Sequence, residues 1–230
     1  MRVEGLTSAG THLILRGIPT IRTGGTVDEA SQKTLGETPP VVLSLEEIGV
    51  LASLFAPSGL ISRLKKRLNY LKRKKCRVVP AKGTTACIDD DDIVYVGVDF
   101  LSRHLDDEET IAGVLAHEWG HACALKPTRD EIQQLNWDQI FELRRAHETL
   151  ADEISGRLLC RMGYTPEGIV KFLTREKGET HNYKYHAPEI RAQVIRYGYE
   201  AEKRKAALAR QLFPKSGLTR EYDSILLDIA

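Results

Sequence analysis

Paired cysteines, excess charge of either sign and long apolar runs are all missing from this 230-residue chain. Its four cysteines are scattered without a C-x-x-C pair: Cys76, Cys87, Cys123 and Cys160. A disulfide framework is therefore not expected. Lys plus Arg (33) nearly cancels Asp plus Glu (32), so net charge favours neither nucleic acid nor a membrane as the partner. The longest apolar stretches stop well short of the ~20 residues that a membrane span requires, and we expect a soluble protein of the cytoplasm.

The first 40 residues differ from the rest of the chain. They are rich in Gly, Thr and Ser, show no sustained period and end in Pro39-Pro40, which predicts a weakly ordered segment, residues 1–40. One hypothesis is that this segment restrains access to an active site, and the alternative is a simple tail. Residues 41–230 are interpreted as one domain, because the chain's apolar content of 42% is enough to bury a core.

Helical periodicity predominates after Pro40. Ser44 and Glu47 have the spacing of a capping box, and the leucines at 60, 64, 68 and 71 lie on one stripe of a second helix. Further helices are expected at about 106–127, 138–162, 166–175 and 187–212. Strands are predicted at 76–80 and 93–98, with an acidic turn, 89–92, before the second. The pattern predicts an α+β fold that is mostly helical with a small sheet.

The helix that begins at Leu60 is strongly basic on the face away from its leucines. The residues are Arg63, Lys65, Lys66, Arg67, Lys72, Arg73, Lys74 and Lys75. We interpret them as a solvated surface, and the alternative is peripheral contact of residues 63–75 with an anionic membrane. Aromatic residues among them are limited to Tyr70, so nucleic acid is not expected as a partner.

The segment with the most specific chemistry is the H-E-x-x-H pattern from His117 to His121. On a helix, residues four apart lie one above the other, so His117 and His121 can present two imidazoles to one metal ion. Glu118 adds a carboxylate that could take a proton from a water molecule at that metal. An apolar run, 111–116, precedes the pattern and favours a helix. The segment predicts a zinc peptidase.

Catalytic zinc usually takes three protein ligands and leaves one position for water. The helix predicted at 138–162 offers Glu148 and Asp152, which are four apart and share one face. Glu148 is the candidate for the third ligand, and Asp152 for the acceptor that orients a ligand imidazole. We therefore expect one zinc ion per chain.

H-E-x-x-H followed by E-x-x-x-D, here Glu148 to Asp152, resembles the gluzincin peptidases of the HtpX and CAAX-prenyl-protease type. Three further segments are similar to that family, within a motif core of about 76–196. They are the strand 93–98, the Gly-Tyr-x-Pro turn at 163–166, and a His-Pro-like segment at 186–188 that is followed by Arg191. The resemblance implies a zincin-like metallopeptidase domain in which an active-site helix follows a small sheet edge.

The same resemblance implies a zinc-dependent metalloendopeptidase with Glu118 as general base. It makes His186 or Arg191 the candidate donor to the oxyanion, and the alternative is that both belong to loop structure. An extended substrate is expected to pair with the edge strand at 94–98, which favours peptides and unfolded polypeptides. Two other functions remain: a cytoplasmic metallopeptidase that cleaves repressors, and a zinc-stabilised, non-catalytic interaction module.

Overall fold

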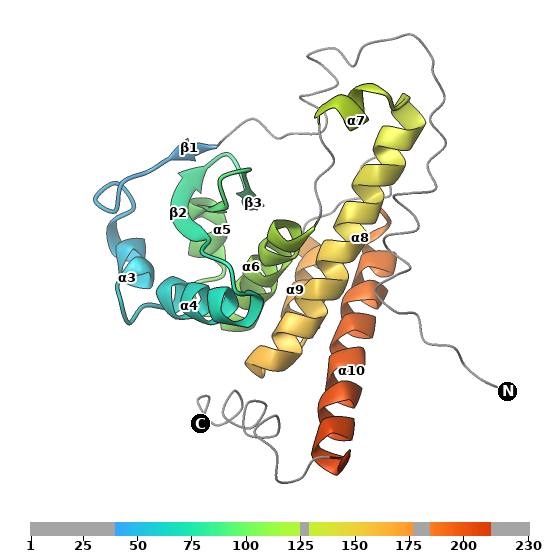
Figure 1. Ribbon diagram of the computed structural model, residues 1–230. Coiled ribbons are helices and arrows are strands. Elements are labelled where there is room, and N and C mark those ends of the chain that lie inside the picture. The colour runs from blue at the N-terminus through green and yellow to red at the C-terminus, as the bar shows by residue number, and fades with distance from the viewer. Residues whose placement is uncertain (1–39, 125–128, 177–184, 213–230) are drawn as a thin grey trace, which may run out of the picture.

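The structure is a computed structural model that describes residues 40–124, 129–176 and 185–212. This part of the chain is mostly helical and contains one small sheet (Figure 1), in agreement with the predicted α+β class. The helices are α3 (Ala52–Phe55), α4 (Leu60–Lys72), α5 (Val98–Arg103), α6 (Glu108–Cys123), α7 (Arg129–Gln133), α8 (Trp137–Met162), α9 (Glu167–Lys171) and α10 (Pro188–Leu212). A 3-10 turn, η1 (Gly49–Leu51), precedes α3, and a π-helical turn, η2 (Phe172–Glu176), follows α9.

The four strands are β1 (Val41–Val42), β2 (Arg77–Lys82), β3 (Ala86–Ile88) and β4 (Ile93–Gly97), in the sheet order β1-β2-β4-β3. β4 therefore lies inside the sheet, parallel to β2 on one side and antiparallel to β3 on the other. The prediction that 93–98 forms an edge strand is wrong, because β3 covers that edge. β3 was not predicted, since three half-buried residues carry no alternating pattern.

The acidic turn at 89–92 closes the hairpin between β3 and β4. One carboxylate oxygen of Asp89 accepts hydrogen bonds from the backbone N–H groups of Asp91 (2.9 Å) and Ile93 (2.8 Å). Its other oxygen accepts one from the Tyr95 hydroxyl at 2.8 Å. An aspartate that bonds backbone groups a few residues on is typical of a tight turn, so this cluster has a structural role.

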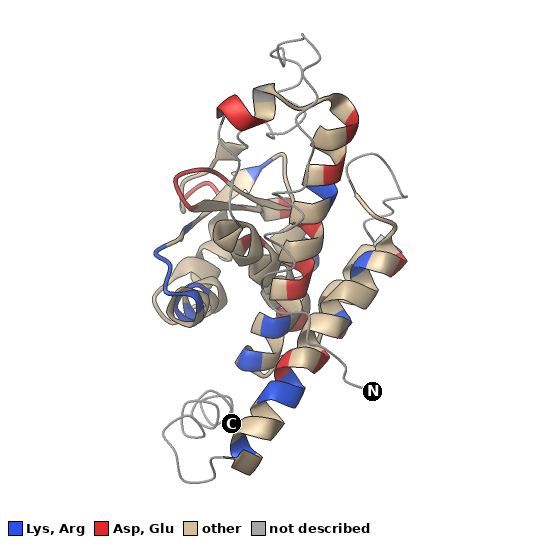
Figure 2. Ribbon diagram, turned by 45° about the vertical axis from the view of Figure 1, so that its right-hand side comes forward, with Lys and Arg blue, Asp and Glu red and all other residues tan. Residues whose placement is uncertain are grey.

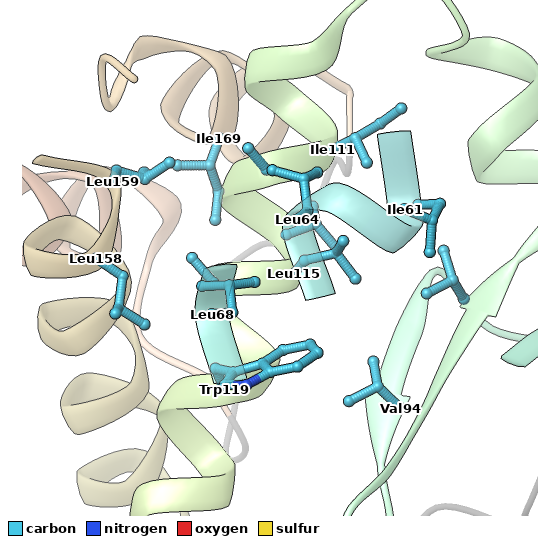
Figure 3. Packing of buried hydrophobic residues seen from close by; sticks show 14 of the residues in the cluster. Ile61, Leu64, Leu68, Val94, Ile111, Leu115, Trp119, Leu158, Leu159 and Ile169 are labelled. Atoms are coloured by element: carbon cyan, nitrogen blue, oxygen red, sulfur yellow. The ribbon is translucent and has the colours of Figure 1, made fainter. Parts of the chain in front are cut away.

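The apolar core lies between α4, the sheet and α6, and it continues into buried residues of α8, α9, η2 and α10. α4 buries the predicted leucine stripe together with Ile61, and its basic residues lie on the remaining surface. Figure 3 shows Leu64 and Leu68 of α4 beside Leu115 and Trp119 of α6. Val94 of β4 lies on the side of this cluster that faces the sheet. Trp119 is the largest side chain that is fully buried in the described part of the molecule.

One polar residue in this core ties three elements together. The side-chain amide of Asn69, on α4, accepts from the Cys76 N–H and donates to the Cys76 carbonyl, both at 3.0 Å. The same Asn69 oxygen accepts a hydrogen bond from the indole N–H of Trp119 at 3.1 Å. Because buried polar groups need partners, this arrangement fixes α4, the chain entering β2 and α6 relative to one another.

The ends of the long helices follow the sequence closely. Asp107 caps α6 by accepting from the Thr110 N–H at 3.0 Å, and Asn136 forms a capping box with Gln139 at the start of α8. Gly163 ends α8 in a left-handed conformation, with φ 78°. α6 ends at Cys123, before the predicted boundary near Pro127.

α8 and α10 run side by side in the same direction (Figure 1), because successive residues of α8 (152, 156 and 157) contact successive residues of α10 (191, 195 and 202). The close approach depends on glycine, because a Cβ on Gly156 would lie 1.9 Å from the Ile195 carbonyl oxygen. α6 crosses α8 at Gly120, where a Cβ would lie 2.6 Å from the Cα of Ala151. These contacts bring one face of α8 against both α6 and α10.

Three further expectations concern the N-terminal segment, the cysteines and membrane-spanning helices. The hypothesis about residues 1–40 falls, except for Pro40, outside the described residues. All four cysteines are free thiols. Within the described ranges, no helix has the length and apolar character needed to cross a bilayer.

Candidate metal centre

Three predicted ligands meet where α6 faces α8. His117 and His121 lie one turn apart on α6, and their Nε2 atoms are 3.1 Å apart with the rings nearly perpendicular. Glu148 extends from α8 toward both rings. Its Oε2 lies 3.3 Å from His117 Nε2, and its Oε1 lies 3.5 Å from His121 Nε2. The sequence prediction of this ligand set is consistent with the geometry, and the three residues could hold a metal ion.

The spacing of these atoms can be compared with that of a tetrahedral site. Zinc binds histidine nitrogen and carboxylate oxygen at about 2.0–2.2 Å, so neighbouring ligand atoms in a tetrahedron are roughly 3.3–3.6 Å apart. The distance between the two Nε2 atoms, 3.1 Å, and that from His117 Nε2 to Glu148 Oε2, 3.3 Å, are close to this edge length, whereas the 3.5 Å contact of His121 is with the other oxygen, Oε1. One ligand atom from each of the three residues lies within 4.8 Å of the others, so the three could hold one metal ion.

Asp152 occupies the position predicted for an orienting carboxylate. It lies one turn after Glu148 on α8, and its Oδ1 is 2.9 Å from Nδ1 of His117. A carboxylate at Nδ1 keeps the proton there and leaves Nε2 free to bind a metal. Asp152 is therefore placed to orient the His117 ring, and this orienting role stays a prediction.

Arg191, on α10, completes a network around these carboxylates. Its Nε and Nη2 bind the two oxygens of Asp152 at 2.8 and 3.0 Å, and Nη2 also lies 3.5 Å from Glu148 Oε2. Only 4% of Arg191 is exposed. The structure places Arg191 at the site, where its guanidinium contacts the two carboxylates. Its suggested role as donor to an oxyanion stays a prediction.

Electrostatics at the site reflect this packing of charges. Burial lowers the pKa of His117. The negative charges of Asp152 and Glu148, and their hydrogen bonds, have a larger effect in the other direction, so the pKa of His117 is raised to about 9. Burial and the neighbouring charge of His117 lower the pKa of His121 to about 4. Burial opposes ionisation of Glu148 and Asp152, yet the histidines and Arg191 keep the pKa of both well below the ordinary range. The centre therefore holds two carboxylates ready to meet a cation.

The two remaining predicted residues lie close in the sequence to members of the network. Glu118 follows His117 on α6 and is only 6% exposed. His186 is half-buried, just before α10 begins. The general-base role of Glu118 and the donor role of His186 both stay predictions.

Sequence reasoning missed Tyr185, which contacts two arginines at the site. Its ring centroid lies 5.4 Å from the guanidinium carbon of Arg191 and 5.6 Å from that of Arg144. Its hydroxyl oxygen accepts a hydrogen bond from Arg144 Nη2 at 3.3 Å. The only signal in the sequence is an aromatic residue beside His186, and such a signal is too common to be informative.

Charge is distributed unevenly around this centre. In Figure 2, acidic residues lie on α7, the start of α8 and the loop before β4, whereas basic residues lie on α4 and toward the ends of α8 and α10. Both signs therefore occur along α8 and α10, whereas the charged residues of α4 are all basic.

Comparison with known proteins adds no relative. No family model matches the chain, and neither a curated protein nor a solved structure matches it.

Proposed function

We propose that this protein is a zinc-dependent metalloendopeptidase of the gluzincin type, resembling the HtpX and CAAX-prenyl-protease family. The observation that carries the proposal is the triangle formed by His117, His121 and Glu148, with Asp152 at the second nitrogen of His117. Two imidazoles and one carboxylate are a ligand set of catalytic zinc sites that leave the fourth position for water. Thiolate ligands, typical of closed structural zinc sites, are not among the three.

Each residue has a distinct role in this proposal. When bound, zinc lowers the pKa of a water ligand towards ~7 and polarises the carbonyl of the substrate. Glu118 accepts the proton of the attacking water and later passes it to the leaving amine. Asp152 holds His117 in the tautomer that binds metal, and Arg191 keeps Asp152 in place. His186 is the candidate hydrogen-bond donor to the oxyanion.

The proposed substrate is an extended segment of a flexible or unfolded polypeptide. β3 is the last strand of the sheet on the side of β4, and it lies beside α6. Its outer edge can accept a further strand through main-chain hydrogen bonds, which a folded substrate cannot supply. The substrate edge is thus assigned to Ala86–Ile88 in place of the strand predicted from the sequence.

The proposal is tested with the Glu118→Gln variant and an unfolded protein as substrate. Glutamine keeps the size of the side chain but cannot accept the proton, so hydrolysis should fall by a factor of about 10² or more while bound zinc stays stoichiometric. Glu142→Gln makes the same change at an exposed position of α8 and should hydrolyse the substrate at the wild-type rate.

Three results have clear meanings in this experiment. Hydrolysis by the wild type that chelators abolish and Glu118→Gln loses would support the enzyme. Undiminished hydrolysis by Glu118→Gln would overturn the general-base assignment. Stoichiometric zinc without hydrolysis of any unfolded substrate would favour the non-catalytic, zinc-stabilised module.

A further inference from the structure

Tyr185 occupies an unusual position between two cations. It is half-buried and lies three residues before α10, at the start of a described range. Arg144, on α8, and Arg191, on α10, both have their guanidinium groups within 6 Å of its ring, at 5.6 and 5.4 Å from the centroid. An aromatic ring at this distance attracts a guanidinium, most strongly where water is excluded.

The edges and faces of the Arg191 guanidinium have different neighbours. Along one edge, Nε and Nη2 are engaged by Asp152, and Nη2 also approaches Glu148. The Tyr185 ring provides an apolar, electron-rich surface to the same group. A planar guanidinium with its donors paired to a carboxylate loses most of its rotational freedom once a ring packs against it. Tyr185 therefore restricts the side chain that holds Asp152.

Arg144 gives Tyr185 a fixed position of its own. It lies one helical turn before Glu148 on α8, and its Nη2 donates to the Tyr185 hydroxyl at 3.3 Å. The ring thus connects α8 with the beginning of α10, next to the carboxylates of Glu148 and Asp152. A chain of contacts runs from Arg144 through Tyr185 and Arg191 to Asp152, and from there to Nδ1 of His117.

We infer that Tyr185 is a positioning residue for the metal centre, acting through Arg191 and Asp152 on the orientation of His117. The inference rests on the proposed metal site and is independent of whether that site hydrolyses peptides. Its ring supplies the effect, and its hydroxyl adds a smaller part through Arg144.

The size of each expected effect depends on how many contacts separate the residue from a metal ligand. Removing a residue that bonds a ligand directly costs roughly 10–100-fold in metal affinity, so a residue one step further should cost about three- to tenfold. Tyr185→Leu, which removes the ring, should therefore weaken zinc binding by about three- to tenfold. Tyr185→Phe keeps the ring and should restore affinity to within about twofold of the wild type.

The experiment measures zinc affinity of the full chain by competition with a chromophoric chelator, and the visible spectrum of the cobalt-loaded protein. Tyr185→Leu should shift the cobalt bands, because the orientation of His117 changes, and Tyr185→Phe should reproduce the wild-type spectrum. Tyr197→Leu is the matched control, since it makes the same change at an exposed position of α10, 51% exposed. It should alter neither measurement.

The outcomes separate a positioning role from a structural one. Wild-type affinity and an unchanged cobalt spectrum in a folded Tyr185→Leu protein would overturn the inference, even if its melting temperature fell. Equal losses in the Phe and Leu variants would also overturn it, because the hydroxyl would then carry the effect. If Tyr185→Leu does not fold, Tyr185→Met is judged by the same criteria. Failure of peptide hydrolysis in the wild type leaves these readouts intact.

Discussion

The two sides of α6 are buried by different means. One side carries Ile111, Leu115 and Trp119 into the apolar core formed with α4 and the sheet (Figure 3). The other side carries His117 and His121 against α8, where their partners are charged. The first side is fully buried by apolar side chains, whereas on the second the His121 side chain keeps 22% of its surface exposed among charged partners.

This difference determines how each side responds to change. Apolar contacts are non-directional, so the core side depends on volume and is supported by many residues at once. The charged side depends on a few atoms at defined distances, because each buried charge needs its partner. We therefore expect core substitutions to alter stability but not metal affinity, and substitutions on the charged side to alter metal affinity directly.

The largest expected effect on stability is at Trp119. Trp119→Ala removes the largest fully buried side chain and the hydrogen bond to Asn69, and should lower the free energy of unfolding by about 3–5 kcal/mol. Urea unfolding of the metal-free protein measures this loss, and chelator competition should show zinc affinity within about threefold of the wild type. Tyr70→Ala, at a position 67% exposed, should change stability by less than about 0.5 kcal/mol. A large loss of zinc affinity in Trp119→Ala would break the distinction between the two sides.

Gly156→Ala should affect both properties, because it lies where α8 meets α10. Alanine usually stabilises a helix relative to glycine by up to about 1 kcal/mol. Here the new Cβ would lie 1.9 Å from the Ile195 carbonyl oxygen, so the helices must separate. We expect a loss of about 1–3 kcal/mol in urea unfolding, together with weaker zinc binding as Arg191 moves from Asp152. A gain in stability would contradict the close contact of α8 with α10 at Gly156.

Asp152→Asn tests the charged side alone. Asparagine keeps the shape of the side chain but loses the charge that binds Arg191 and orients His117. Zinc affinity should fall roughly 10–100-fold, equivalent to about 1.4–2.7 kcal/mol, in chelator competition. Glu153→Gln removes the neighbouring carboxylate, which pairs with Arg157 on the surface, and should leave zinc affinity unchanged. Unchanged affinity in Asp152→Asn would contradict its role at His117.

The smallest effect is expected at a surface ion pair remote from both sides of α6. Arg196 donates two hydrogen bonds to Glu167, at 3.0 and 2.7 Å, and both side chains are largely exposed. Arg196→Gln should cost less than about 1 kcal/mol at neutral pH. The hydrogen bonds and charge of Arg196 lower the pKa of Glu167 below its usual value of 4.5. The contribution is therefore present above about pH 4.5 and is lost as the pH falls through the lowered pKa, so the difference between variant and wild type in urea unfolding should shrink progressively below pH 4.5.

Local sequence signals predicted the helices that carry the candidate metal ligands. The i, i+4 pairs of His117 with His121 and of Glu148 with Asp152 lie within helices whose bounds were closely predicted. The reciprocal hydrogen bonds of Ser44 and Glu47 also form as the capping box predicts, although the residues after them make only turns before α3. These features depend on residues three or four positions apart, and such pairs can be read directly from the sequence.

Features that depend on distant residues could not be predicted in the same way. The edge of the sheet was assigned to the wrong strand because the pairing of β3 with β4 depends on a hairpin that its short, unpatterned sequence does not indicate. The partner of Arg191 is on α8, and no periodicity within α10 predicts which face of another helix it will meet. The place of Tyr185 depends on the same helix pairing, so it became evident only in three dimensions.

The burial of Trp119 also gives the unmodified chain an optical reporter. Of its two tryptophans, Trp119 is fully buried, whereas Trp137 is 46% exposed at the start of α8. An indole enclosed by hydrocarbon emits at shorter wavelength than one in water and is shielded from ionic quenchers. Iodide should therefore quench the Trp137 emission and leave that of Trp119, whose red shift on adding urea then follows the loss of the apolar core. Fluorescence would thus report on one side of α6, while cobalt absorption reports on the other.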